Sequence, residues 1–196
     1  MSERTVYTIG HSNLDAKAFV ALLKRNDITA VADVRSSPFS RYHTQFNREH
    51  LNVFLKRYGI HYVFLSAELG ARSDDPSCYV DGQVQYARLS QTPIFRAGLE
   101  RVKNGADTHK IALMCAEKDP LECHRTLLVA NELAAENVAI KHILSDGTTE
   151  RHEDAMQRLV REEDVEPLFF NPGQMIGEAC RRRESKIAYV LDEARG

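Results

Sequence analysis

The sequence contains no tryptophan, only four cysteines among 196 residues, and a formal net charge of −2. No stretch approaches the ~20 consecutive apolar residues of a membrane-spanning helix, and the first residues lack the apolar run of a signal peptide. A near-neutral charge gives no general attraction to nucleic acid or anionic lipid, so such binding needs a local patch. Four cysteines in a chain of this length favour reduced thiols in the cytoplasm over a disulfide framework. These features exclude membrane, secreted and fibrous classes.

What is present is a regular alternation of two patterns. Short β-branched runs predict strands over residues 5–9, 30–34, 61–65, 110–114 and 139–144. Apolar residues at helical spacing predict intervening helices over residues 14–23, 47–58, 92–103 and 119–136, and another from about residue 152. This alternation predicts an α/β fold, a three-layer sandwich with a mostly parallel sheet of about five strands.

The last part of the chain has a different pattern. Pro167, Pro172 and Gly173 interrupt a short apolar run that includes Phe169 and Phe170, and helical spacing resumes over about 176–191. We therefore expect an α/β domain over residues 1–163 and a C-terminal helical arm over residues 164–196. The two phenylalanines are expected to pack this arm on the domain.

Polar clusters follow four of the predicted strands, at the edge where parallel α/β sheets bind their ligands. The first cluster is Gly10-His11-Ser12, and the second occupies residues 33–41. Arg72 follows the third strand, and residues 115–125 follow the fourth. Because these strand ends meet at one edge, the sequence predicts a single pocket there.

Three of these clusters resemble a known family. Gly-His-Ser at 10–12, Asp-Val-Arg-Ser-x-Pro-x-Ser-Arg at 33–41 and Cys-x7-Cys-His-Arg at 115–125 are similar to domain-of-unknown-function family 488. The resemblance extends from the first predicted strand to about the fifth. It implies an α/β domain and brings no known activity with it.

Candidate catalytic residues are His11, Cys115, Glu117 and His124. A thiol at a strand end, facing the N-terminus of a capped helix, has a lowered pKa and acts as a nucleophile. The acidic residues of the following loop act in the opposite direction, because they raise a thiol pKa. The sequence therefore leaves three alternatives for Cys115: a functional thiol, a buried inert thiol, or a disulfide partner of Cys123. His11 is a candidate general base, the alternative being an exposed ring beside a helix cap.

Candidate substrate-binding residues combine guanidinium groups and hydroxyls, which suit phosphate or carboxylate. Asp33 is expected to pair with a neighbouring arginine, which would give both residues a structural role. The aromatic residues around Arg41 are candidates for holding a flat ring. The full set is Ser12, Asp33, Arg35, Ser36, Ser40, Arg41, Arg72 and Arg125.

By ligand type, a zinc site would combine Cys115, Cys123, His124 and His11. The sequence contains neither a Cys-x-x-Cys nor a His-x3-His pair, and zinc sites usually include such close pairs. We therefore assign no metal from the sequence, and no other cofactor is indicated.

The favoured function is an enzyme, a hydrolase or transferase, that acts on an anionic nucleotide-like or nucleic-acid-derived substrate. One alternative is a non-catalytic module that binds nucleic acid or a small anion, helped by the basic run 181–183. That run has no interleaved aromatic residues and spreads around a helix, which favours a solvated face. The other alternative is a metal-dependent hydrolase. The sequence indicates no oligomeric state.

Overall fold

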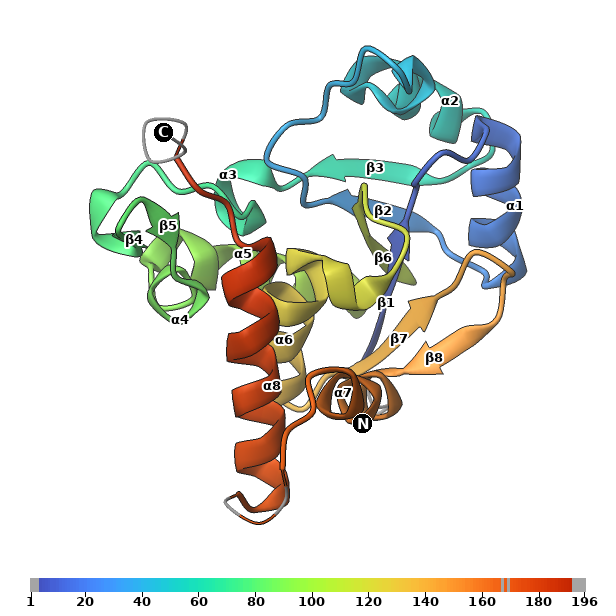
Figure 1. The fold of residues 1–196 in the computed structure, drawn as a ribbon. Helices are drawn as coiled ribbons and strands as arrows, with labels where there is room; N and C mark the ends of the chain where they lie inside the picture. The colour runs from blue at the N-terminus through green and yellow to red at the C-terminus, as the bar shows by residue number, and fades with distance from the viewer. Residues whose placement is uncertain (1–3, 167, 169, 192–196) are drawn as a thin grey trace.

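The computed structural model of the protein describes residues 4–166, 168 and 170–191. Its main sheet has six strands in the order β3-β2-β6-β1-β7-β8, all parallel except β8, which runs antiparallel to β7 (Figure 1). The strands are β1 (Thr5–Gly10), β2 (Ala30–Asp33), β3 (His61–Phe64), β6 (Ile111–Cys115), β7 (Ala139–Ile143) and β8 (Thr149–Arg151). The five predicted strands are confirmed to within one residue at each end.

The sequence does not predict β8, because this strand carries no apolar pattern. It consists of Thr149, Glu150 and Arg151, none of which is buried. A tight turn with Gly147 in the left-handed region (φ 82°) folds the chain back beside β7. Backbone pairing with β7 forms this edge strand, and the Glu150 side chain accepts hydrogen bonds from Arg158 of the chain that follows (3.0 Å).

Helices cover both faces of the sheet, which confirms the three-layer architecture (Figure 1). On one face, α1 (Ala16–Arg25) and α2 (Arg48–Lys56) pack against Val31, Ala112 and Met114. The other face packs against α5 (Pro93–Ala106), the π-helix η4 (Arg125–Ala130), α6 (Asn131–Ala135) and α7 (His152–Glu162). The remaining short elements are η1 (Thr44–Phe46), α3 (Ser66–Leu69), η2 (Pro76–Cys78), β4 (Tyr79–Val80), β5 (Gln83–Val84), α4 (Tyr86–Leu89) and η3 (Pro120–Glu122).

The single helix predicted over 119–136 is wrong at its start. Asp119 does cap a turn, since its side chain accepts a hydrogen bond from the Leu121 N–H, but this turn is the short 3-10 helix η3. Cys123 is then extended (φ −146°, ψ 140°), and the longer helical segment begins after His124. The cap at Asp119 is confirmed and the predicted helix length is wrong, because cap residues mark where a turn begins and not how far it continues. The break allows Cys123 and His124 to point toward the same region.

The C-terminal arm is the helix α8 (Pro172–Ile187), which begins four residues earlier and ends four residues earlier than predicted. Asn171 and Gln174 form a reciprocal capping box at its start. After α8 the chain runs beside the β4–β5 hairpin, where the Val84 N–H donates to the Tyr189 carbonyl (2.9 Å). Phe170 packs against the core, whereas Phe169 and residues 192–196 lie outside the described residues. Within the described part of the chain, no helix has the length and apolarity required to cross a membrane.

Candidate functional site

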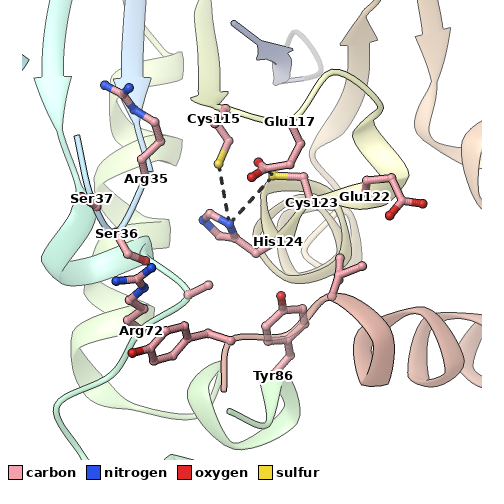
Figure 2. A pocket seen from close by; sticks show the side chains of 14 residues that line it. Arg35, Ser36, Ser37, Arg72, Tyr86, Cys115, Glu117, Glu122, Cys123 and His124 are labelled. Carbon is pink, nitrogen blue, oxygen red and sulfur yellow. Dashed lines mark hydrogen bonds between the residues drawn. The ribbon is translucent and has the colours of Figure 1, made fainter. Parts of the chain in front are cut away.

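A cavity of about 230 Å³ lies beyond the carboxyl ends of β2 and β6 (Figure 2). Cys115, Glu117, Cys123 and His124 line one part of it. Arg72 and aromatic side chains from α4 and from the chain after α8 line another. The predicted edge of the sheet is therefore hollowed, and the C-terminal arm helps to enclose it.

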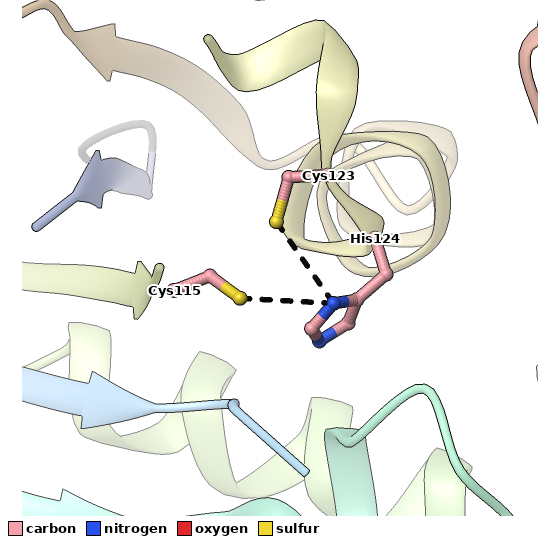
Figure 3. Close-up of side chains that lie close together, drawn as sticks. All are labelled: Cys115, Cys123 and His124. Atoms are coloured by element: carbon pink, nitrogen blue, oxygen red, sulfur yellow. Dashed lines mark hydrogen bonds between the residues drawn. The ribbon is translucent and has the colours of Figure 1, made fainter. Parts of the chain in front are cut away.

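Cys115, Cys123 and His124 point toward one another within this cavity (Figure 3). The His124 Nδ1 atom lies 3.8 Å from the Cys115 Sγ and 3.9 Å from the Cys123 Sγ. All three side chains are buried, and their ligand atoms lie within 4.8 Å of one another. The other ring nitrogen, Nε2, lies 2.9 Å from the Val34 carbonyl oxygen. A carbonyl can only accept, so Nε2 carries a hydrogen and Nδ1 is the nitrogen that faces the two sulfurs.

Glu117 adds a carboxylate to this group. The Cys123 thiol donates to its Oε2 at 2.9 Å, and the carboxylate lines the same cavity. Burial and the neighbouring Cys123 raise the pKa of Glu117 above its ordinary value. Glu117 thus has the character of a group that exchanges a proton nearer to neutral pH.

The two buried thiols differ in acidity. The adjacent Cys123 sulfur and burial raise the pKa of Cys115 well above its ordinary value. Burial also acts to raise the pKa of Cys123, but Cys115 and the positive charge of Arg125 outweigh burial and lower it. For His124, burial is outweighed by the neighbouring Cys123, which raises the pKa of the imidazole. Cys123 is therefore the more acidic thiol of the pair.

His11 lies in a separate, neighbouring hollow of about 500 Å³. Its ring stacks on Phe46 with centroids 4.2 Å apart, and its Nδ1 donates to the Ser12 carbonyl (2.9 Å). Its Nε2 then accepts from the Arg35 Nη1 at 3.2 Å. Burial, with a smaller contribution from Arg35, lowers the pKa of His11 to about 4. His11 is thus held as a neutral ring.

Arg35 and Asp33 form a buried two-pronged ion pair. Arg35 Nε donates to Asp33 Oδ1 (2.9 Å) and Arg35 Nη2 to Asp33 Oδ2 (2.6 Å). The Tyr62 hydroxyl also donates to Asp33 (2.6 Å). This geometry matches the structural role that the sequence allowed for the pair, and most of the Arg35 donors are already used inside the protein.

Two adjacent hollows therefore replace the single pocket predicted from the sequence. Arg35, Ser37, Ala116 and Glu117 line both, so these residues form the boundary that the two hollows share. Ser12 and Ser40 line the second hollow with His11, whereas Ser36 lines the first with Arg72.

The arginines predicted to bind substrate have different environments. Arg72 lines the first hollow with its guanidinium over the Tyr189 ring (4.3 Å), and in the described chain no carboxylate lies within 4.0 Å of it. Arg41 is exposed and lines neither hollow. Arg125 also lines neither hollow, because it is fully buried and donates to the carbonyls of Glu117 (2.8 Å) and Lys118 (3.3 Å). Arg125 holds the loop that carries Glu117, and Arg72 is the arginine available to a ligand.

Sequence reasoning did not identify Tyr86, Ile187 and Tyr189 as lining residues of the first hollow. Tyr86 begins α4, and the other two belong to the end of the C-terminal arm. The backbone N–H of Tyr86 donates to Glu184 of α8 (2.6 Å), which joins these two regions. No local motif marks such residues, because they reach the hollow only through the packing of the arm.

The family profile described as domain of unknown function DUF488 matches residues 15–131, more than half of the chain. The chain belongs to the DUF488 family. The matched DUF488 range contains both cysteines of the site, His124 and the Asp33–Arg35 pair, and it ends before α7 and α8. Searches among curated proteins and among solved structures found no match.

Proposed function

We propose that this DUF488 protein is an enzyme that acts on a small anionic, nucleotide-like or nucleic-acid-derived substrate. The observation that supports this most is the first hollow, where Arg72 is available beside the buried Cys115, Cys123 and His124 and the carboxylate of Glu117. A cation without a carboxylate partner attracts a substrate anion, and ionisable groups with shifted pKa values cluster at catalytic sites.

The sizes of the two hollows suit a substrate with two parts. The first, at about 230 Å³, suits a phosphate or carboxylate group bound by Arg72. The second, at about 500 Å³, includes the exposed Phe39 ring, on which a planar base or similar group can stack. Together they reach the volume usual for the pockets of drug-sized ligands, roughly 300–1,000 Å³.

The reaction class that fits these groups is hydrolysis or group transfer. Glu117 accepts or donates the proton, because its raised pKa places it closer to neutral pH than an ordinary carboxyl. His124 and the two thiols lie beside it as further reacting or metal-binding groups. The protein works in a reducing compartment such as the cytoplasm, since all four cysteines are free and two of them lie in the site.

The test is a turnover screen over phosphomonoesters, nucleotides, oligonucleotides and small carboxylates, followed by kinetics on any compound that reacts. Arg72→Gln should raise KM by roughly tenfold or more, because a charge-assisted hydrogen bond is worth about 1.5–3 kcal/mol. Glu117→Gln should lower kcat. Arg151→Gln, which changes an exposed arginine at the far edge of the sheet, serves as the control.

Equal KM values for Arg72→Gln and Arg151→Gln would contradict the anion-binding role of Arg72. Binding of these anions without turnover of any of them would contradict the catalytic role and favour the binding-module alternative.

A further inference from the structure

We propose that Cys115, Cys123 and His124 bind a zinc ion, with the remaining coordination position facing the first hollow. Binding of the ion depends only on these three side chains. Any part that the ion takes in turnover rests on the function proposed above.

The first argument is the placement of the three ligand atoms. In a tetrahedral site with Zn–S of about 2.3 Å and Zn–N of about 2.05 Å, sulfur and nitrogen lie about 3.6 Å apart. The His124 Nδ1 lies 3.8 Å from one sulfur and 3.9 Å from the other. A shift of a few tenths of an ångström therefore brings the imidazole nitrogen to coordination spacing from each sulfur, and all three ligand atoms already lie within 4.8 Å of one another.

The second argument is the hydrogen bond on the far side of the imidazole. Histidines that bind metals almost always donate their second ring N–H to a carbonyl or carboxylate, which fixes the ring and its tautomer. The His124 Nε2 lies 2.9 Å from the carbonyl oxygen of Val34, the residue that follows strand β2. The ring is thus oriented with Nδ1 toward both thiols before any ion binds.

The third argument is that hydrogen bonding alone does not explain this convergence. Sulfur is a weak donor and a weak acceptor, so two buried thiols gain little from an imidazole. The three groups come from two separate parts of the backbone, Cys115 from the end of β6 and the adjacent Cys123 and His124 from the break before η4. Coordination of one ion accounts for their approach to a single buried point.

The donor set also selects the kind of ion. Thiolate and imidazole ligands suit zinc, whereas magnesium and calcium require oxygen ligands. Zinc sites with three protein ligands usually hold water or substrate in the fourth position. All three side chains line the first hollow together with Glu117, so that position is open to a substrate bound by Arg72.

The test is the metal content of the full chain, purified without chelator from cells grown with added zinc. We expect about one zinc ion per chain by elemental mass spectrometry. After chelation and reconstitution with cobalt(II) alone, the protein should show thiolate-to-cobalt charge-transfer absorption. These two measurements use the wild-type chain, so they do not depend on whether a variant folds.

The matched variants are Cys115→Ser and Cys123→Ser against Cys180→Ser. Cys180 is a half-buried thiol on α8 that contacts Asn131 and Met156, outside the cluster. The first two substitutions should weaken zinc affinity by about a hundredfold or more, and Cys180→Ser should leave it unchanged. Glu117→Gln should keep the metal while it lowers turnover.

A reduced wild-type chain that binds neither zinc nor cobalt would overturn the inference, as would a Cys115–Cys123 disulfide that leaves no metal site after reduction. Equal loss of zinc in Cys180→Ser and Cys115→Ser would also overturn it. Bound zinc without turnover of any anion supports this inference and contradicts the proposed enzyme. Turnover by a chain that binds neither zinc nor cobalt supports the enzyme and contradicts this inference.

Discussion

Gly10 lies where the loop after β6 crosses the end of β1. A Cβ at this position would lie 1.8 Å from the Glu117 carbonyl oxygen and 3.1 Å from the Arg125 Nη2. Arg125 donates to that same carbonyl, so its guanidinium fixes the loop beside the glycine. The absence of a side chain at residue 10 therefore sets the position of Glu117.

We predict that Gly10→Ala lowers the free energy of unfolding by about 1–3 kcal/mol, the usual effect of overpacking a closed region. It should also weaken zinc binding and turnover, because the loop with Glu117 must move. Urea denaturation measures the first effect, and metal content measures the second.

The control for this substitution is Gly177→Ala. Gly177 lies inside α8, and no heavy atom lies within 4 Å of an added Cβ. Alanine there should raise stability by about 0.5–1 kcal/mol, because it lowers the entropy of the unfolded chain. Similar stability of the two variants would show that the loop accepts a Cβ at residue 10.

At the scale of the elements, Arg183 attaches α8 to the domain. Its Nε donates to Glu163 (2.6 Å) and its Nη2 to Glu162 (2.9 Å), both at the end of α7, and its Nη1 contacts Glu122 of η3. Arg181 and Arg182 both bind Glu178. Because each arginine of the basic run has a carboxylate partner, the run offers little free charge to a nucleic acid.

We predict that Arg183→Met lowers the free energy of unfolding by about 3 kcal/mol, because it leaves the buried Glu163 with Lys186 as its remaining cation. It should also weaken ligand binding, since α8 leads to Tyr189 in the first hollow. Arg181→Met is the matched control. Arg181 is 69% exposed, and its loss should change stability by less than about 0.5 kcal/mol. Equal effects of the two substitutions would mean that Arg183 does not anchor the arm.

At the scale of the whole molecule, a buried chain of hydrogen bonds links the sheet to the helices. Thr8 of β1 bonds His142 of β7 (2.8 Å), which bonds His152 of α7 (3.1 Å), which bonds the Asn131 Oδ1 of α6 (2.9 Å). The Asn131 amide nitrogen donates to the Leu127 carbonyl, so its oxygen faces His152 and accepts. Each imidazole therefore donates in one direction, accepts in the other, and is neutral.

The neutral state of both histidines in this hydrogen-bonded network predicts a loss of protein stability in mild acid. Burial lowers the pKa of His152 to about 4, and burial lowers that of His142 well below its ordinary value. Between pH 6.5 and pH 4 the unfolded state binds protons that the folded state excludes. The contribution of these histidines to the free energy of unfolding is therefore complete above this range and is lost as pH falls. From pH 7 to pH 5, His152 alone should lower the free energy of unfolding by about 2 kcal/mol.

Urea denaturation at a series of pH values measures this effect, with His152→Gln for comparison. The variant should be less stable at pH 7 and should lose less stability than the wild type between pH 6.5 and pH 5. Identical pH slopes for the two proteins would contradict a neutral, buried His152. His11 also contributes to the pH slope, and it does so in both proteins. The difference between the two slopes therefore reports the contribution of His152.

The sequence by itself determined the parallel strands and the edge that carries the site. β-branched runs, such as 30–34, and helical spacing of apolar residues depend on neighbours in the chain, and such neighbours are visible in a short window. The pairing of Asp33 with an arginine was predictable for the same reason, because the two residues lie two positions apart. Parallel pairing then brings the strand ends, and the polar residues after them, to one side.

The tertiary structure decided how those polar residues are divided. His11 follows β1 and Cys115 ends the adjacent strand β6, yet they line different hollows. The extended backbone at Cys123 brings two sulfurs and an imidazole together without any close-spaced motif. The arm closes the first hollow through Tyr189, more than sixty residues from His124 in sequence. These positions depend on packing between distant segments, and the energy of that packing is absent from any local pattern of residues.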